Sequence, residues 1–183
     1  MKVELIACSR PLPGQCGTVK NPMGLTPSPM RIIEQAASVC YDSKPDFWNF
    51  KITRNCAKSG HLSVFEHIYF TFHVTGISRA CLAQLTRHRH SSFSVRSQRY
   101  CIEAGAEKED ARMVLPNGAP TELCISMNAR ALIEASHLRM CRRAQSEIRS
   151  LFMAMQRCVA PIAPEIANMM VPQCEINPQY QFC

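Results

Sequence analysis

The chain has 183 residues, of which 46% are hydrophobic and 19% charged, a balance that is typical of one globular domain and excludes a disordered chain. No stretch approaches the roughly 18 unbroken apolar residues of a membrane span, and the N-terminus lacks the apolar segment of a signal peptide, so we expect no membrane partner. The formal charge of +7, from 21 Lys and Arg against 14 Asp and Glu, favours an anionic partner: a nucleotide, a nucleic acid or a phosphate-bearing cofactor.

The N-terminal part of the chain predicts one strand and two helices. Residues 2–8 alternate in polarity as a strand does. Ser28-Pro29 opens a helix, because proline fits the first helical turn and apolar residues follow at helical spacing. A second helix is expected over 48–58, stopping near Gly60.

The clearest strand is EHIYFTFHVTG at 66–76. Its apolar side chains share one face: Ile68, Phe70, Phe72 and Val74. Gly76 is expected to end this strand, and Ser78 to N-cap a helix that runs to about residue 88.

The C-terminal half adds a strand and two helices. Residues 90–100 predict a loop or a short strand, and 122–127 a strand. Asn128 is expected to N-cap a helix through about residue 141, and the last long helix should end before Pro161. This order of elements predicts a mixed α and β class, α+β, in one domain.

Eleven cysteines without a C-x-x-C pair argue against a zinc ribbon, a redox pair or a disulfide framework. Free thiols of this kind are typical of a reducing cytosol, so we expect a cytoplasmic protein. His67 and His73 stand at a strand period rather than at the spacing of metal ligands, so no metal site is expected, and Trp48 is expected in the core.

The segment RHRHSSFSVRSQRY, residues 87–100, is the most unusual local feature, with four arginines, two histidines and four serines. The planar guanidinium of arginine suits phosphate and carboxylate. Gln84, Arg87 and His88 follow the i, i+3, i+4 spacing of one helix face. Composition alone is compatible with a solvated basic loop or with binding of RNA or single-stranded nucleic acid.

The order of residues narrows these alternatives. Arg87-His88-Arg89, seven residues and then Ser97 resembles the signature motif of the flavin-dependent thymidylate synthases. GHLSVFEHIYFTFHV at 60–74 resembles the Gly-His-x-Ser-x-Phe-Glu-His segment of the family, and DARMVLPNG at 110–118 and MNARALIEASHLRMCRRAQSEIR at 127–149 resemble its second half. The resemblance covers roughly residues 28–175.

The resemblance implies the thymidylate synthase-complementing protein fold, one α+β domain over 1–183 with a central, mostly antiparallel sheet flanked by helices. It implies an enzyme that methylates dUMP to dTMP with FAD as cofactor and NADPH and methylenetetrahydrofolate as co-substrates. It also implies a homotetramer with sites shared between subunits, and no nucleic-acid partner.

The family match assigns residues to the flavin nucleotide. Ser63 is implied to contact it from a neighbouring subunit, with His61 and Glu66 nearby. The residues implied to bind FAD are Ser63, Arg87, His88, Arg89, Asn128, Ala129 and Arg130. Asn128 stands at a predicted helix N-terminus, which favours negative charge.

A second group is implied to bind dUMP: Gln84, Arg87, Arg96, Ser97, Gln98, Arg99, Arg112 and Arg139. Arg139 resembles the family arginine that faces the uracil ring, where a cation would stabilise uracil ionised at N3; it is the implied catalytic residue. Ser97 is interpreted as a ligand contact rather than a nucleophile, because the motif surrounds it with cations and supplies no base.

The sequence departs from the family in several places. Relatives carry a helical segment of several tens of residues after the Arg-Tyr of the motif, and here the match resumes at once, as if that segment were absent between 102 and 103. Glu134 stands where the family often has Asn or His against the flavin, and Val95 replaces an acidic or polar residue.

Two alternatives stay open at this level. The chain is compatible with a remnant that binds FAD and dUMP but does not turn over, because the missing segment would affect assembly. It is also compatible with a basic module that binds nucleic acid through the same arginines, with an affinity that falls steeply with salt.

Overall fold

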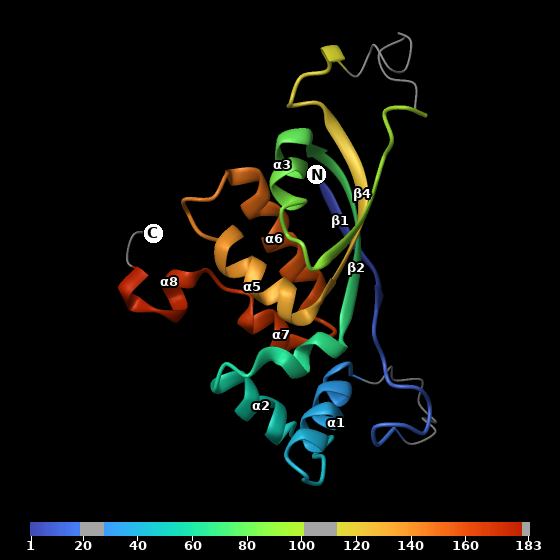
Figure 1. Cartoon of the computed structure of the whole chain (residues 1–183), viewed down its shortest axis with the longest axis vertical. Helices are drawn as coiled ribbons and strands as arrows, with labels where there is room; N and C mark the ends of the chain where they lie inside the picture. Colours follow the sequence, from blue (N-terminus) through green and yellow to red (C-terminus); the bar gives the residue numbers. More distant parts are fainter. Residues whose placement is uncertain (19–27, 101–112, 181–183) are drawn as a thin grey trace.

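A four-stranded antiparallel sheet forms the centre of the described part of the protein, and the helices at the middle of the molecule lie to one side of that sheet (Figure 1). The structure is a computed structural model that describes residues 1–18, 28–100 and 113–180. The strand order is β1-β2-β4-β3. The strands are β1 (Lys2–Cys8), β2 (Tyr69–Ser78), β3 (Ser91–Val95) and β4 (Pro120–Asn128). The α+β class and the antiparallel sheet that the sequence predicted are confirmed.

The helices fall into three groups along the long axis of the molecule (Figure 1). The lower end holds α1 (Met30–Cys40), α2 (Lys51–Lys58) and the 3-10 helix η1 (Leu62–His67). The middle and upper parts hold α3 (Arg79–Leu85), α5 (Ala129–Arg139), α6 (Ser146–Val159) and α7 (Pro164–Met169). The short α8 (Gln173–Ile176) and η2 (Pro178–Tyr180) project to one side. None of the described helices is long and apolar enough to span a bilayer.

The alternation of β2 separates the core from the open face of the sheet, as the sequence predicted. Phe70, Phe72 and Val74 are fully buried against the helices. On the opposite face Thr71 Oγ1 lies 2.9 Å from Ser126 Oγ of β4. Because side chains alternate along both paired strands, the buried face is mostly apolar between residues 70 and 74 of β2, and the opposite face carries polar side chains.

The prediction that Gly76 ends the second strand is wrong. β2 continues to Ser78, and its register against β4 shifts between Thr75 and Ile77. Gly76 lies in this bulge with a φ of +73°, a conformation that glycine adopts without strain. The bulge turns Ile77 into the core, where it is fully buried, and lets Ser78 begin α3.

Three further expectations change at the lower end of the molecule. α2 starts at Lys51 rather than at residue 48, because Phe50 has a φ of +50° and turns the chain there. Trp48 is not in the core: it is 81% exposed, and its ring lies 5.4 Å from the guanidinium carbon of Arg31. The first residues of the predicted strand at 66–76 belong instead to η1.

The buried carboxylate of Glu34 joins α1 to α2. It accepts hydrogen bonds from the backbone N–H groups of Ile52 and Thr53 at 3.3 and 2.9 Å, and from the Thr53 hydroxyl at 2.7 Å. Those two N–H groups lie in the first turn of α2, where no intrahelical acceptor is available. Glu34 therefore caps α2 from another helix, with the favourable sign for the helix dipole.

We expect the substitution Glu34→Ala to lower the free energy of unfolding by about 2–4 kcal/mol, because it leaves buried N–H and O–H donors without acceptors. Urea denaturation followed by circular dichroism measures this change. Glu4→Ala, at an exposed carboxylate that pairs with Lys2, serves as control and should leave the midpoint almost unchanged. Equal effects of the two substitutions would contradict the capping role.

Candidate functional site

The junction of β4 and α5 places the Asn128-Ala129-Arg130 segment. Asn128 pairs with Tyr69 at the end of β4, and the N–H of Ala129 donates to the carbonyl of Ile68 at 2.8 Å. Asn128 Oδ1 accepts from the N–H of Ala131 at 2.7 Å, so the predicted N-cap is confirmed. Arg130 is thereby held on the first turn of α5, beside η1.

Arg130 is bound by two carboxylates. Its Nη1 lies 2.7 Å from Glu66 Oε1 of η1, and its Nε lies 2.8 Å from Glu134 Oε1 one turn along α5. The hydrogen bond to Glu134, followed by that to Glu66, raises the pKa of Arg130. Ser63 is exposed on the same 3-10 helix as Glu66. The structure therefore brings together a residue from each of two implied cofactor segments.

α3 is fixed against α6 at its first turn. The N–H of Ser78 donates to Glu147 Oε1 at 2.7 Å, and the Ser78 hydroxyl, which also donates to Glu147, accepts from the N–H of Cys81 at 3.0 Å. At the other end of α3, Gln84 Nε2 donates to Gln145 Oε1 at 2.7 Å. These contacts determine where the chain leaves α3 and enters the segment 87–91.

Arg139, the last residue of α5, reaches this exit. Its Nε donates to His88 Nε2 at 2.9 Å, and its Nη2 donates to the carbonyl of Gln84 at 3.1 Å. Burial, with a smaller contribution from Arg139, lowers the pKa of His88. Burial, and then Arg87, lowers the pKa of Arg139. The predicted catalytic arginine and two implied ligand-binding residues are therefore in direct contact.

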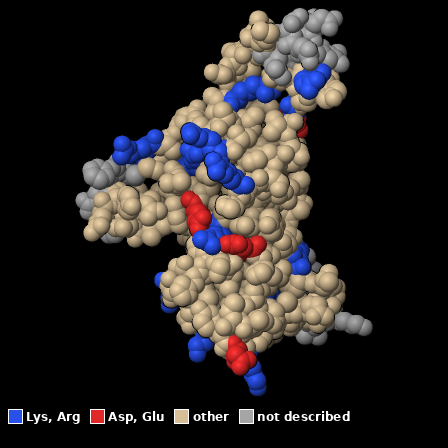
Figure 2. All heavy atoms as spheres, in the orientation of Figure 1, with Lys and Arg blue, Asp and Glu red and all other residues tan. Residues whose placement is uncertain are grey.

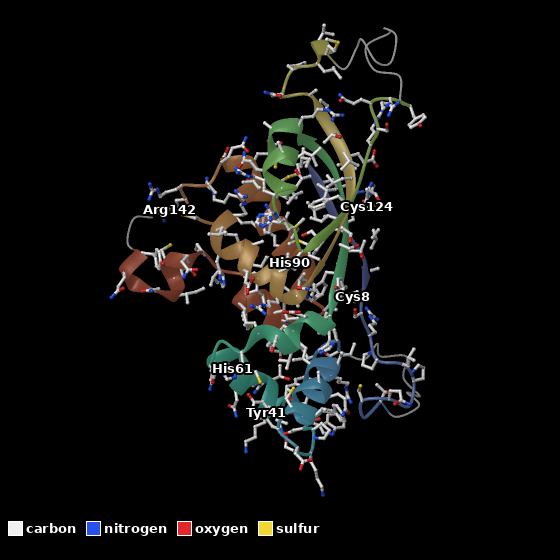
Figure 3. The ribbon with its side chains drawn as sticks, viewed as in Figure 1. Cys8, Tyr41, His61, His90, Cys124 and Arg142 are labelled. Carbon is white, nitrogen blue, oxygen red and sulfur yellow. The ribbon has the colours of Figure 1, made fainter. Side chains whose placement is uncertain are left out.

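A cavity of about 170 Å³ lies between the segment 88–91 and one face of α5. Its lining residues are His88, Arg89, His90, Ser91, Met127, Ala131, Glu134, Ala135 and Leu138. The hydroxyl of Ser91 is buried and has no hydrogen-bond partner within the protein. Buried polar atoms are nearly always hydrogen-bonded, so this hydroxyl is suited to bind a ligand. Figure 3, in which His90 is labelled, shows this side of α5.

Several residues of this cavity are not among those that the family resemblance implies. His90, Ser91 and Leu138 line the cavity. Glu134, which stands where the family often has Asn or His against the flavin, lines the cavity and also binds Arg130. The sequence does indicate the lining residues of α5, because residues 131, 134, 135 and 138 follow the spacing of one helix face. That face begins at the same turn as the Asn-Ala-Arg segment.

A larger cavity of about 660 Å³ lies elsewhere, between α6 and α8. Arg142, which Figure 3 labels, and Arg149 line it together with Met140 and Met153, but none of the implied ligand-binding residues does. Figure 2 shows basic side chains gathered on this face of the molecule, with acidic side chains among them. In the described part of the chain, no three His, Cys, Asp or Glu side chains are grouped to hold a metal ion.

The segment 96–99 lies apart from this site. β3 runs from Ser91 to Val95, about 14 Å at the rise of a strand, and the N–H of Arg96 donates to the carbonyl of Glu122 at 2.9 Å. Figure 1 shows this end of β3 far from α5. Within one chain the structure therefore separates the segment 96–99 from Gln84, Arg87 and Arg139.

Within that segment, Ser97 Oγ accepts from the N–H of Arg99 at 3.2 Å, a turn contact without a base. Gln98 Nε2 is buried without a partner. Arg112 and the 102/103 junction lie outside the described residues.

The fold is that of known solved structures. The flavin dependent thymidylate synthase ThyX from Helicobacter pylori, complexed with FAD and dUMP, matches with a TM-score of 0.74 and 20% identity, over 93% of this chain and 100% of that one. The UMP/dUMP methylase PolB from Streptomyces cacaoi, bound with 5-Br dUMP, matches with a TM-score of 0.69 and 21% identity, over 92% and 93%. The protein is thus an α+β protein of the ThyX fold.

Sequence comparison defines the family. The model of the thymidylate synthase complementing protein family, Thy1, matches residues 23–107 and 101–165. The flavin-dependent thymidylate synthase of Geobacter sulfurreducens is 36% identical over 84% of this chain and 87% of its own length, and that of Clostridium tetani 32% identical over 81% and 85%. The chain belongs to the family of the flavin-dependent thymidylate synthases.

The alignment with the Geobacter relative is longer than the part of this chain that it covers. The alignment with the Geobacter relative extends over 201 positions, whereas 84% of 183 residues is about 154, so about 47 positions have no counterpart here. The two parts of the family match overlap at 101–107. That overlap contains the junction at which the sequence analysis expected a segment to be absent.

The cap of α5 yields a direct prediction. Asn128→Ala should lower the free energy of unfolding by about 1 kcal/mol, because the N–H of Ala131 loses its acceptor. Asn128→Asp keeps an oxygen at the cap and should retain the stability of the wild type. Thermal melting of the three proteins measures the difference, and an alanine variant as stable as the wild type would show that the cap is energetically unimportant.

Proposed function

We propose that this protein catalyses the reductive methylation of dUMP to dTMP, with methylenetetrahydrofolate as carbon donor, FAD as cofactor and NADPH as reductant. The observation that carries the proposal is the contact of Arg139 with His88 and Gln84, which joins two of the segments that resemble the family's motifs in one site. The names of the relatives, and the FAD and dUMP bound in a protein of the same fold, support it.

The residues beside α5 fit a flavin nucleotide. The unpartnered Ser91 hydroxyl offers a hydrogen bond inside the cavity, and Arg89 lines the same cavity. Arg87, Arg89 and Arg130 would hold the anionic pyrophosphate, beside the N-terminus of α5. Bound FAD would supply hydride transfer, for which no described side chain is suited.

The size of the cavity supports a shared site. At about 170 Å³ it is smaller than the roughly 300–1,000 Å³ typical of small-molecule sites, so one chain encloses only part of a dinucleotide. The segment 96–99, which we assign to the phosphate and sugar of dUMP together with Arg112, lies about 14 Å away along β3. We therefore infer that a second copy supplies this segment and Ser63, in a homotetramer.

Arg139 would act on the uracil ring. Its guanidinium stabilises negative charge at N3 of uracil, because an opposite charge within a few ångströms favours the ionised form. Gln84 and Arg87 lie on the adjacent end of α3 and would orient the nucleotide. The electron-rich ring then attacks the one-carbon unit, whose bond to the folate nitrogen breaks, or accepts hydride. Neither step needs an enzyme nucleophile, which agrees with the turn contact of Ser97.

We further propose that residues 1–183 form one domain that lacks a helical segment of the family between about residues 102 and 103. The gap of about 47 positions against the Geobacter relative supports this. Eight of the described cysteines are free thiols, namely Cys8, Cys16, Cys40, Cys56, Cys81, Cys124, Cys158 and Cys174, which supports a cytoplasmic location.

An absorption spectrum tests the proposal first. The purified protein, supplied with FAD, should show a bound flavin spectrum that changes on titration with dUMP, because both ligands occupy one site. UMP serves as the control ligand. A folded sample that takes up no flavin would contradict the proposal, and salt-dependent binding of RNA would then favour the nucleic-acid module. A sample that binds both ligands but produces no dTMP would be the inactive remnant.

The substitution Arg139→Ala should leave FAD bound and lower the rate of dTMP formation about a hundredfold or more, because the developing charge on uracil loses its cation. The affinity for FAD and for dUMP is measured by the flavin spectrum, and turnover by chromatography. Arg157→Ala, at an exposed arginine of α6, is the matched control. Near-normal turnover of Arg139→Ala would exclude the assigned role.

A further inference from the structure

We propose that His88 is the positioning residue of Arg139: its neutral imidazole accepts the Nε–H of Arg139 and fixes the guanidinium for dUMP, so that substrate use depends on the protonation of His88. The inference rests on the proposed function, because Arg139 is taken to face the substrate. It assigns to His88 a task other than contact with the flavin nucleotide.

The geometry fixes the guanidinium from two directions. Nε of Arg139 points to His88 Nε2 at 2.9 Å, and Nη2 to the Gln84 carbonyl at 3.1 Å. With two of the three nitrogens bound, the plane of the guanidinium is determined, and Nη1 takes part in neither bond. An arginine held in this way loses little side-chain freedom when a substrate arrives.

The imidazole is itself held in place. The ring of Phe152, which is fully buried in α6, lies 5.9 Å from the His88 ring at an interplanar angle of 58°. The backbone N–H of His88 donates to the Leu85 carbonyl at 3.1 Å. His88 therefore links α6 and the end of α3 to the last residue of α5.

The contact requires the neutral ring. A nitrogen that accepts a hydrogen bond carries no proton, so the proton of neutral His88 lies on Nδ1. Protonation would place an N–H against the Arg139 N–H and oppose two cations. Burial, and next the charge of Arg139, lower the pKa of His88 below its ordinary value of 6.5, so the neutral acceptor is the form present at neutral pH.

The other charged groups around the ring do not reverse this preference. Arg87 and Arg89 flank it in the chain, and His90 and Glu134 line the same cavity, where Glu134 is bound to Arg130. On α3, burial and then Glu147 raise the pKa of the Cys81 thiol to about 12, so that thiol is neutral. The facing side chain of α6, Phe152, carries no charge.

A pH dependence follows. Above pH 6.5 the ring is neutral and Arg139 is held. As the pH falls below 6.5 and through the lowered pKa of His88, the ring gains a proton and Arg139 loses its acceptor. We expect kcat/KM for dUMP to fall on this acidic limb, because the free enzyme must hold Arg139 in place to bind and activate the nucleotide.

Two substitutions at His88 distinguish the effect of its hydrogen-bond acceptor from the effect of its aromatic ring. His88→Phe keeps an aromatic ring against Phe152 but has no acceptor, and should lower kcat/KM for dUMP about tenfold or more above pH 6.5, where the wild-type ring is neutral. His88→Gln offers an amide oxygen that accepts but does not titrate, and should retain more activity than His88→Phe and lose the acidic limb. The FAD-loaded variants are compared from pH 5 to 8, with the affinity for FAD measured separately.

His73→Gln is the matched control, because His73 lies on the open face of the sheet, bound to Glu122 at 2.6 Å. It should keep the acidic limb. Any of three results would overturn the proposal. The acidic limb could persist in His88→Gln, it could disappear in His73→Gln, or His88→Phe could have the kcat/KM of the wild type.

A second measurement does not depend on turnover. In protein labelled at histidine, the nuclear magnetic resonance titration of His88 should give a pKa below 6.5 that rises in Arg139→Ala, and a neutral ring protonated at Nδ1. A pKa unchanged by Arg139→Ala would overturn the pairing. If the wild type shows this titration but its flavin spectrum does not respond to dUMP, the proposed function fails and the pairing stands.

Discussion

The antiparallel pairing of β2 with β4 determines where the candidate site forms. β2 leads into α3 at one end of the strand pair, and β4 leads into α5 at the other end. The two helices therefore start at opposite ends of the sheet, and their C-terminal ends meet. Carbonyl groups at a helix C-terminus lack intrahelical partners and carry partial negative charge. Arg139 is the last residue of α5 and donates to the Gln84 carbonyl of α3. One guanidinium therefore places positive charge at the C-terminal ends of both helices.

The two arginines of α5 have contrasting surroundings. Arg130, in the first turn, is bound by the carboxylates of Glu66 and Glu134, which raise its pKa. Arg139, in the last turn, is bound by a neutral imidazole and a backbone carbonyl, and its pKa is lowered by burial. Positive charge is therefore largely neutralised at one end of the helix and retained at the other. An anionic ligand that lies along α5 meets a graded potential rather than a uniform basic surface.

Local sequence predicted most elements, and the exceptions have physical reasons. The N-caps at Ser78 and Asn128 follow from side chains that accept from the next turn. The sequence predicted a strand end at Gly76, where the structure has a bulge. Glycine is common at strand ends and at bulges, and only the pairing of β2 with β4 distinguishes the two. The family motifs name Arg139 and His88 as site residues, but they do not predict the contact between them, which joins residues 51 positions apart. The separation of the segment 96–99 from Arg139 depends on the direction of β3, which no motif encodes.

The Glu34 cap has a consequence for the order of folding. Its hydrogen bonds close loops of 12–19 residues, whereas Thr71 and Ser126 of the sheet are 55 residues apart, and Cys158 contacts Val3 across 155 residues. Short loops cost less entropy to close and form faster. The end of the molecule built from α1, α2 and η1 can therefore assemble while the ribosome is still translating β4. The half that carries Arg139 must wait for nearly the whole chain, and until then the apolar face of β2 stays uncovered and open to aggregation.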